Sequence, residues 1–167
     1  MSLRVQPESR EDSDGIRAVH LAAFPTPAEA DLVQMLHDDL DSQISLVAKD
    51  GAQVVGHVML SRMQVEGDGR SYRALGLGPV AVIPELQRRG VGSALIDEAM
   101  RLAEQRGEEI VFLLGEPDYY RRFGFSREAA APFASPYAGP YFMAKSFGSP
   151  LPASGTAAYA PAFAQLS

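Results

Sequence analysis

The amino-acid sequence predicts a single α/β (α+β) domain built on a mixed, mostly antiparallel sheet of seven strands. The 167 residues, of which 46% are hydrophobic, are enough for one sizeable core. A helix pair and hairpin patterns fill the first half of the chain, which is typical of antiparallel strands. A strand, a Gly-rich turn, a helix and another strand follow over residues 74–114 and indicate a right-handed parallel unit.

The composition argues against several classes of function. A formal net charge of −6 disfavours a general binder of nucleic acid or anionic membranes. With no cysteine and three scattered histidines, a thiolate zinc site or Cys nucleophile is excluded and no metal is expected. The N-terminus lacks the apolar core of a signal peptide, and no apolar run has transmembrane length, so we expect a cytoplasmic protein.

The chain begins with a predicted strand and two helices. Leu3–Gln6 alternates as a strand does, and the acids of residues 11–14 favour a helix that Phe24–Pro27 ends. A second helix is predicted over residues 28–40, with Glu29 in its first turn. Glu29 there either complements the helix dipole or contacts a cationic substrate.

The remaining strands are expected over residues 44–48, 53–60 (with an extension to 65 as the alternative), 72–83, 109–114, from 125 onward, and 141–147. A helix follows the Gly-rich turn to Arg106, and a short helix precedes Gly124. We expect one domain over 1–167, with its core over about 3–147. The Pro-containing tail, 148–167, has no pattern that places it.

The fourth predicted strand contains Gly76, Gly78 and Pro79 in a run apolar enough for the centre of a sheet. Because proline donates no ladder hydrogen bond, we expect a break near Gly78–Pro79. The break would leave the backbone groups of Val80 to Val82 free for another partner. A simple strand end followed by a loop explains the same residues.

The main functional signal is the segment Gln87-Arg88-Arg89-Gly90-Val91-Gly92, between a strand and a helix. Free N–H groups at such a helix start bind phosphate, and the helix dipole assists them. A nucleotide triphosphatase loop is disfavoured because no Lys stands between Gly92 and Ser93. A dinucleotide site is disfavoured because the third Gly is missing and the segment lies mid-chain. The pyrophosphate of coenzyme A is the third candidate.

These motifs resemble those of the GNAT superfamily of N-acetyltransferases. Gln87-x-x-Gly90-x-Gly92 matches the family signature, after a strand of the expected form Val80-Ala81-Val82-x-Pro84. Tyr120-x-x-x-Gly124-Phe125 matches a later family element. The Tyr119–Tyr120 pair and the closing Ala158–Phe163 resemble the branch of predicted N-acetyltransferases with unknown substrate. The resemblance implies a GNAT-type sheet, with helices on both faces and a splay between strands four and five.

The resemblance also implies which residues hold acetyl-CoA. The pantetheine arm would lie in the splay and pair with Val80 and Val82, and the pyrophosphate would lie on the N–H groups of residues 88–93. The implied cofactor-binding residues are Val80, Ala81, Val82, Gln87, Arg88, Arg89, Gly90, Val91, Gly92, Ser93 and Tyr120.

The implied reaction is direct transfer of acetyl to a small-molecule or peptide amine in a ternary complex. Tyr120 matches the family's general acid and would protonate the leaving thiolate, although packing beside Phe123 is its alternative role. Many relatives use a Glu on strand four as base, but residues 72–82 contain no acid. The base candidates are Glu29, His57, Glu85, Glu116 and Asp118, or a water relay.

Among the base candidates, we select Glu116, which lies beside the splay. Glu29, His57 and Tyr119 are the predicted substrate residues. A lone His within a strand is otherwise structural. The alternative function is a non-catalytic acyl-CoA-binding sensor or regulatory module, which the missing acid favours. A monomer or a homodimer is expected.

Overall fold

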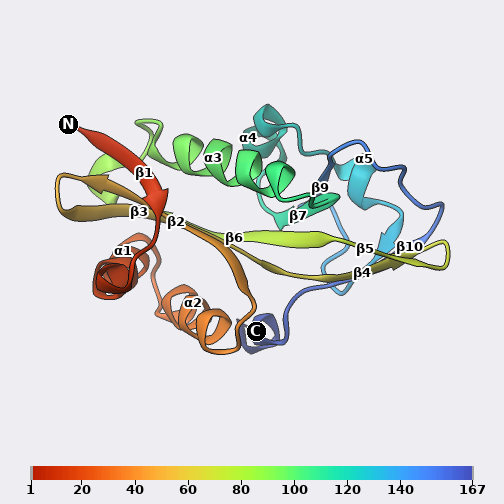
Figure 1. Cartoon of the computed structure of the whole chain (residues 1–167), viewed down its shortest axis with the longest axis horizontal. Helices are drawn as coiled ribbons and strands as arrows, with labels where there is room; N and C mark the ends of the chain where they lie inside the picture. Colours follow the sequence, from red (N-terminus) through yellow and green to blue (C-terminus); the bar gives the residue numbers. More distant parts are fainter. Residues whose placement is uncertain (1, 167) are drawn as a thin grey trace.

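The computed structural model, which describes residues 2–166, has a six-stranded sheet in the order β1-β2-β3-β6-β7-β9 (Figure 1). Its strands are β1 (Leu3–Pro7), β2 (Ser42–Asp50), β3 (Gln53–Arg62), β6 (Ala74–Val82), β7 (Ile110–Leu114) and β9 (Phe142–Ser146). β6 and β7 are parallel, and the other neighbours are antiparallel. A second sheet, in the order β5-β4-β10-β8, consists of β4 (Gln64–Gly67), β5 (Arg70–Tyr72), β8 (Phe133–Ala134) and β10 (Gly155–Ala158).

Helices cover both faces of the six-stranded sheet, as predicted (Figure 1). They are α1 (Ser13–Ala23), α2 (Ala28–Asp38), α3 (Val91–Gln105), α4 (Pro117–Tyr120) and α5 (Arg127–Ala130). The 3-10 turns are η1 (Arg10–Asp12), η2 (Pro84–Leu86), η3 (Arg121–Phe123) and η4 (Pro161–Leu166). α1 and α2 lie on one face, and α3 and α4 lie on the other. Within residues 2–166, no helix combines the length and apolar character needed to cross a membrane.

Each face of the sheet has its own hydrophobic core. Successive residues of a strand point to opposite faces, so Leu46 and Val47 of β2 enter different cores. Leu46 packs in the core that contains Leu95 of α3, and Val47 in the core that contains Val19 of α1 and Leu36 of α2. The mixed, mostly antiparallel α/β fold predicted from the sequence is therefore confirmed.

β6 separates from β7 partway along its length. The two strands pair only from Ala74–Gly76 to Ile110–Phe112. Beyond Gly76, β6 continues to Val82 with β3 as its strand partner in the described part of the chain. The predicted splay between the fourth and fifth strands is thus confirmed, and it leaves one edge of Val80–Val82 without a neighbouring strand.

A bulge in β6 lies directly after this separation. The register between β3 and β6 shifts between Val58 and Leu60, so that Gly78 and Pro79 together oppose one residue of β3. Since Pro79 has no N–H to donate, the bulge places it where a ladder bond is already absent. The break predicted near Gly78–Pro79 is confirmed, although Val80–Val82 still pair with β3 on their other edge.

The C-terminal part of the chain departs from the prediction. The strand expected from Phe125 onward is a single bridge between Ser126 and Ala144. It ends there because the Ser126 hydroxyl accepts a hydrogen bond from the Ala129 N–H (3.1 Å) and so starts α5. The main sheet has six strands instead of the predicted seven for this reason.

The tail, which the sequence could not place, completes the domain. β10 lies between β4 and β8 in the second sheet, and η4 contacts α2 (Figure 1). Ala157 and Ala162 of these two segments are buried. The described part of the tail therefore belongs to the core that was predicted to end near residue 147.

A buried ion pair fastens the start of α1 to the sheet. Lys49 Nζ of β2 lies 2.7 Å from Asp12 Oδ1, and both side chains are at most 10% exposed. The other carboxylate oxygen of Asp12 accepts hydrogen bonds from the N–H (2.8 Å) and the hydroxyl (3.1 Å) of Ser9. The same carboxylate thus caps η1 and neutralises Lys49.

We predict that Asp12→Ala lowers the free energy of unfolding by about 3–5 kcal/mol, because it leaves the Lys49 ammonium buried without its counter-ion. Urea unfolding followed by circular dichroism measures this change. Asp14→Ala, which removes an exposed acid from the first turn of α1, is the control and should change stability by less than about 0.5 kcal/mol. Equal effects of the two substitutions would contradict the assignment.

Candidate active site

A cavity of about 410 Å³, here named the loop cavity, lies beside the Gly-rich loop before α3. It is lined by Ala23, Phe24, Val80, Ala81, Val82, Leu86, Gln87, Arg88, Gly90, Gly92, Ser93, Tyr119, Tyr120 and Arg122. Most residues predicted to bind acetyl-CoA are in this lining. Val91, the first residue of α3, is instead buried in the core, and Arg89 is exposed outside the lining.

The loop presents a row of unpaired backbone donors. Among residues 2–166, none accepts a hydrogen bond from the N–H groups of residues 88–93, whereas the Ala94 N–H donates to Gly90 O (3.0 Å). Arg88 (φ 65°) and Gly90 (φ 86°) take left-handed conformations and make the tight turn into α3. Unpaired N–H groups at the start of a 15-residue helix favour an anion.

Side chains hold this loop in place and add positive charge. Gln87 Nε2 donates to Val82 O (2.9 Å), which joins the loop to the end of β6. Arg122 Nη2 donates to Ser93 Oγ (3.3 Å), and the Arg122 guanidinium lies 4.5 Å from the centre of the Tyr119 ring. The Tyr119 hydroxyl is also 3.3 Å from Ser93 Oγ. Tyr119, predicted as a substrate residue, thus lies on the anion side of the site.

A second cavity of about 640 Å³, here named the aromatic cavity, lies in the splay between β6 and β7. It is lined by Phe24, Glu29, Leu32, Leu77, Gly78, Pro79, Val80, Leu114, Tyr120, Pro136, Tyr137, Tyr159, Phe163 and Ala164. The two cavities share Phe24, Val80 and Tyr120. A ligand that extended from one cavity into the other would pass these residues.

Tyr120 stands at the junction of the two cavities. Its ring lies against Gly115, where a Cβ atom would overlap it, so the close approach requires glycine at this position. Burial and the neighbouring Tyr119 raise the pKa of Tyr120 to about 12. The phenol is therefore protonated at neutral pH and is available as a proton donor.

Two buried polar atoms in the aromatic cavity have no hydrogen-bond partner among the described residues, Glu29 Oε1 and the Tyr159 hydroxyl. Burial and the nearby Tyr137 raise the pKa of Tyr159, so this phenol is also protonated at neutral pH. Native proteins usually satisfy buried polar atoms. Both atoms belong to residues that line the cavity, so the protein leaves two polar groups beside it unsatisfied.

Of the predicted base candidates, three acids lie outside both cavities. Glu85, Glu116 and Asp118 are exposed and absent from both linings. Glu116 is the N-cap residue of α4, and Asp118 lies 3.5 Å from Arg121. Among the predicted acidic base candidates, Glu29 is the one that lines a cavity, namely the aromatic cavity.

His57 lies in the core on the α1 side of the sheet. Its Nδ1 is 2.8 Å from His20 Nε2, and its Nε2 is 2.8 Å from Ser45 Oγ. Burial lowers the pKa of His20 to about 4, and burial together with the imidazole of His20 lowers that of His57 to about 3. Both rings are fully buried and neutral, so the geometry gives His57 a structural role.

Several residues of the aromatic cavity were missed in the sequence. Phe24 was interpreted only as the end of a helix, and Tyr159 and Phe163 lie in the tail that could not be placed. The spacing of these two aromatic residues in a segment otherwise made of Ala and Pro was the available signal. Side chains from α2, β6 and the tail meet only in the folded chain.

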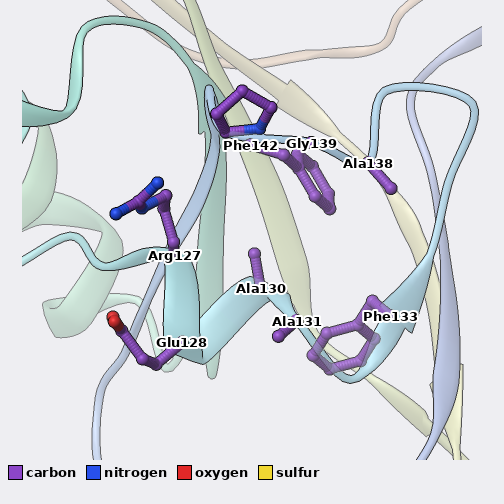
Figure 2. A pocket seen from close by; sticks show the side chains of 9 residues that line it. Arg127, Glu128, Ala130, Ala131, Phe133, Ala138, Gly139 and Phe142 are labelled. Carbon is purple, nitrogen blue, oxygen red and sulfur yellow. The ribbon is translucent and has the colours of Figure 1, made fainter.

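A third cavity, of about 580 Å³, lies between α5, β8 and the loop before β9 (Figure 2). Its lining shares no residue with the other two cavities. Small and aromatic side chains border it, including Ala130, Phe133 and Phe142, while Arg127 and Glu128 extend at one side. None of the predicted site residues lies here.

In residues 2–166, no group of three or more His, Asp and Glu residues could hold a metal ion.

The sequence profile of the Acetyltransferase (GNAT) domain matches residues 4–127 of the chain. The chain therefore belongs to the GNAT family of N-acetyltransferases. It is 38% identical to the uncharacterized N-acetyltransferase YjhQ of Escherichia coli (strain K12) over 118 residues, which are 70% of this chain and 65% of YjhQ. The match thus spans less than two thirds of that relative.

Two solved structures are similar over nearly the whole chain. A GNAT family acetyltransferase from Brucella melitensis in complex with acetyl-CoA has a TM-score of 0.82 and 32% identity, covering 97% of this chain and 98% of that chain. YhbS from Escherichia coli in complex with CoA has a TM-score of 0.84 and 27% identity, covering 97% and 92%.

We predict that neither His20 nor His57 takes up a proton between about pH 7 and pH 5, because burial disfavours the charged imidazole. Both folded-state pKa values lie below the unfolded value of 6.5. Their stabilising contribution is therefore complete above about pH 6.5 and declines as the pH falls towards the folded-state values. Titration of the imidazole carbon-bound proton resonances by NMR measures the uptake. A midpoint near the unfolded value for either ring would refute the buried neutral pair.

Proposed function

We propose that this GNAT-family chain transfers acetyl from acetyl-CoA to an amine by direct attack in a ternary complex. The observation that carries the proposal is the meeting of two cavities at Val80 and Tyr120. One cavity is bordered by unpaired N–H groups suited to a pyrophosphate, and the other contains a carboxylate suited to an amine. The relatives that bind acetyl-CoA or CoA support the assignment of the first cavity.

The loop cavity fits the polar part of coenzyme A. The N–H groups of residues 88–93 would donate to the pyrophosphate, and the side chains of Arg88 and Arg122 would add charge-assisted contacts. The pantetheine arm carries amide groups that can pair with a strand. The edge of Val80–Val82 left free by the splay is such a partner.

Acetyl-CoA supplies the thioester, and the chain's residues position it and move protons. The neutral amine forms a C–N bond to the acetyl carbon while the C–S bond breaks. An ammonium substrate releases two protons in all, of which one ends on sulfur and the other goes to solvent. Tyr120, protonated and at the junction, would donate to the sulfur and recover its proton from the nitrogen. A backbone N–H at the β6 bulge would stabilise the negative charge on the carbonyl oxygen.

The rival function is an acyl-CoA sensor without turnover. The absence of an acid on β6 favours it, whereas Tyr120 and Glu29 in one continuous site favour the enzyme. Release of free thiol from acetyl-CoA in the presence of a broad amine panel separates the two. Tight acetyl-CoA binding with no thiol release by any amine would support the sensor.

We predict that Tyr120→Phe lowers kcat by about 10²–10³-fold, because the leaving thiolate loses its proton donor. The Kd for acetyl-CoA should change by less than about threefold, since the ring and its packing remain. Thiol release and calorimetry measure the two quantities. Tyr141→Phe, at an exposed position outside both cavities, is the control. Unchanged kcat in Tyr120→Phe would remove the phenol from the mechanism.

We predict that Arg122→Ala raises the Kd for CoA by about tenfold, because a charge-assisted contact to phosphate contributes roughly 1.5 kcal/mol. Arg121→Ala is a matched control, since Arg121 is the adjacent exposed arginine and lies outside the loop cavity. Calorimetric titration with CoA compares the two. If both substitutions weaken binding equally, long-range charge rather than the Arg122 contact is responsible.

A further inference from the structure

We propose that the aromatic cavity accepts a primary amine carried on an apolar, ring-sized body, and that Glu29 determines this choice by binding the ammonium group. The inference rests on the proposed function, because it names the class of acceptor for the same reaction. It follows from the size of the cavity, its lining and its single charged group.

The cavity has the size and surface of a site for an apolar organic molecule. Its volume of about 640 Å³ falls within the usual range for small-molecule sites. Phe24, Leu32, Pro79 and Phe163 are among the apolar residues that line it. An aromatic or aliphatic ring would bury its surface there, whereas a polyhydroxylated or polycationic body would lose its water without gaining partners.

Glu29 is the charged side chain that lines this cavity in the described part of the chain. Its Oε1 atom is buried and has no hydrogen-bond partner. Oε1 has almost no accessible surface, so Glu29 borders the cavity through the rest of its partly exposed side chain. An ammonium group bound beside this carboxylate would supply both a donor and the opposite charge. The carboxylate therefore selects a cation rather than a neutral or anionic group.

The helix dipole alone does not explain why the Glu29 side chain lines the aromatic cavity. Asp31 lies in the same first turn of α2 and also complements the dipole, yet it is exposed and pairs with Arg17 at 3.0 Å. Glu29 instead lines the cavity, is only partly exposed, and has one buried oxygen without a partner in residues 2–166. Asp31 thus already has a cationic partner on the surface, whereas Glu29 has none among the described residues and lines the cavity.

The aromatic part of the lining is held in position by its packing against other residues. The Tyr159 ring lies 5.4 Å from Tyr137 and 4.8 Å from Phe163, measured between ring centres. It also packs on Gly76 of β6, where a Cβ atom would lie 2.6 Å from the ring. The Tyr159 hydroxyl is buried and has no partner among the described residues.

The lining also disfavours amines that carry a carboxylate. No Lys, Arg or His from residues 2–166 lines the aromatic cavity, so a substrate carboxylate would have no counter-ion there and would stand near Glu29. Free amino acids are therefore disfavoured relative to amines without a carboxylate.

The test compares 2-phenylethylamine, 2-aminoethanol, phenylalanine and spermidine as acceptors, with thiol release from acetyl-CoA as the readout. We expect kcat/KM for 2-phenylethylamine to exceed that for each of the others by at least about tenfold. Equal or greater kcat/KM for any of the other three acceptors would overturn the inference.

Glu29→Gln, which keeps the shape and removes the charge, tests the carboxylate. The KM for 2-phenylethylamine should rise about tenfold or more, and the KM for acetyl-CoA should change by less than about twofold. Inhibition by neutral 2-phenylethanol should not weaken. Asp31→Asn is the matched control and should leave both KM values unchanged. Equal effects of the two substitutions on the amine KM would contradict the role of Glu29.

If no amine causes thiol release from acetyl-CoA, the proposed function fails. The selectivity of the aromatic cavity is then tested by amine binding alone. Calorimetric titration of the CoA-saturated protein with 2-phenylethylamine serves this purpose. Binding that Glu29→Gln weakens about tenfold would support the inference independently of turnover. No binding to the wild-type chain would overturn it.

Discussion

The separation of β6 from β7 after Gly76 is the constraint on which the rest of the site depends. A closed sheet would satisfy every backbone group and leave no room between these strands. Because pairing stops after three residues of each strand and the bulge at Gly78–Pro79 follows, the edge of Val80–Val82 is left free. The same separation forms the aromatic cavity and brings Tyr120 beside Val80.

The two cavities divide the chemistry between them. The loop cavity offers backbone donors and arginines, which suit a charged and hydrated group that must be held firmly. The aromatic cavity is apolar except for Glu29 and tyrosine hydroxyls, which suit recognition of one cationic group on an apolar body. Tyr120 belongs to both linings, so the proton donor lies where the two bound groups would meet.

The sequence was sufficient for the parts of the site that are local. Gln87–Gly92 and Tyr120 were predicted because a loop before a helix and a motif on one short helix are continuous in the chain. The side chains of Arg89 and Val91 lie outside the lining of the loop cavity, so only their backbone N–H groups belong to the proposed site. His57 was considered for catalysis because no sequence pattern reveals that His20 from another element contacts it. Tyr159 and Phe163 depend on a tail whose place is fixed only by β10 joining β4 and by η4 contacting α2.

The central claim is that both cavities serve one reaction, with the acyl group delivered at Val80 and Tyr120. A crystal structure of the chain with bound CoA tests it most directly. We expect the pyrophosphate on the N–H groups of residues 88–93 and the thiol sulfur within hydrogen-bond reach of the Tyr120 hydroxyl, open to the cavity that contains Glu29. A sulfur atom that points away from Tyr120, or a CoA molecule bound outside the splay, would contradict the account.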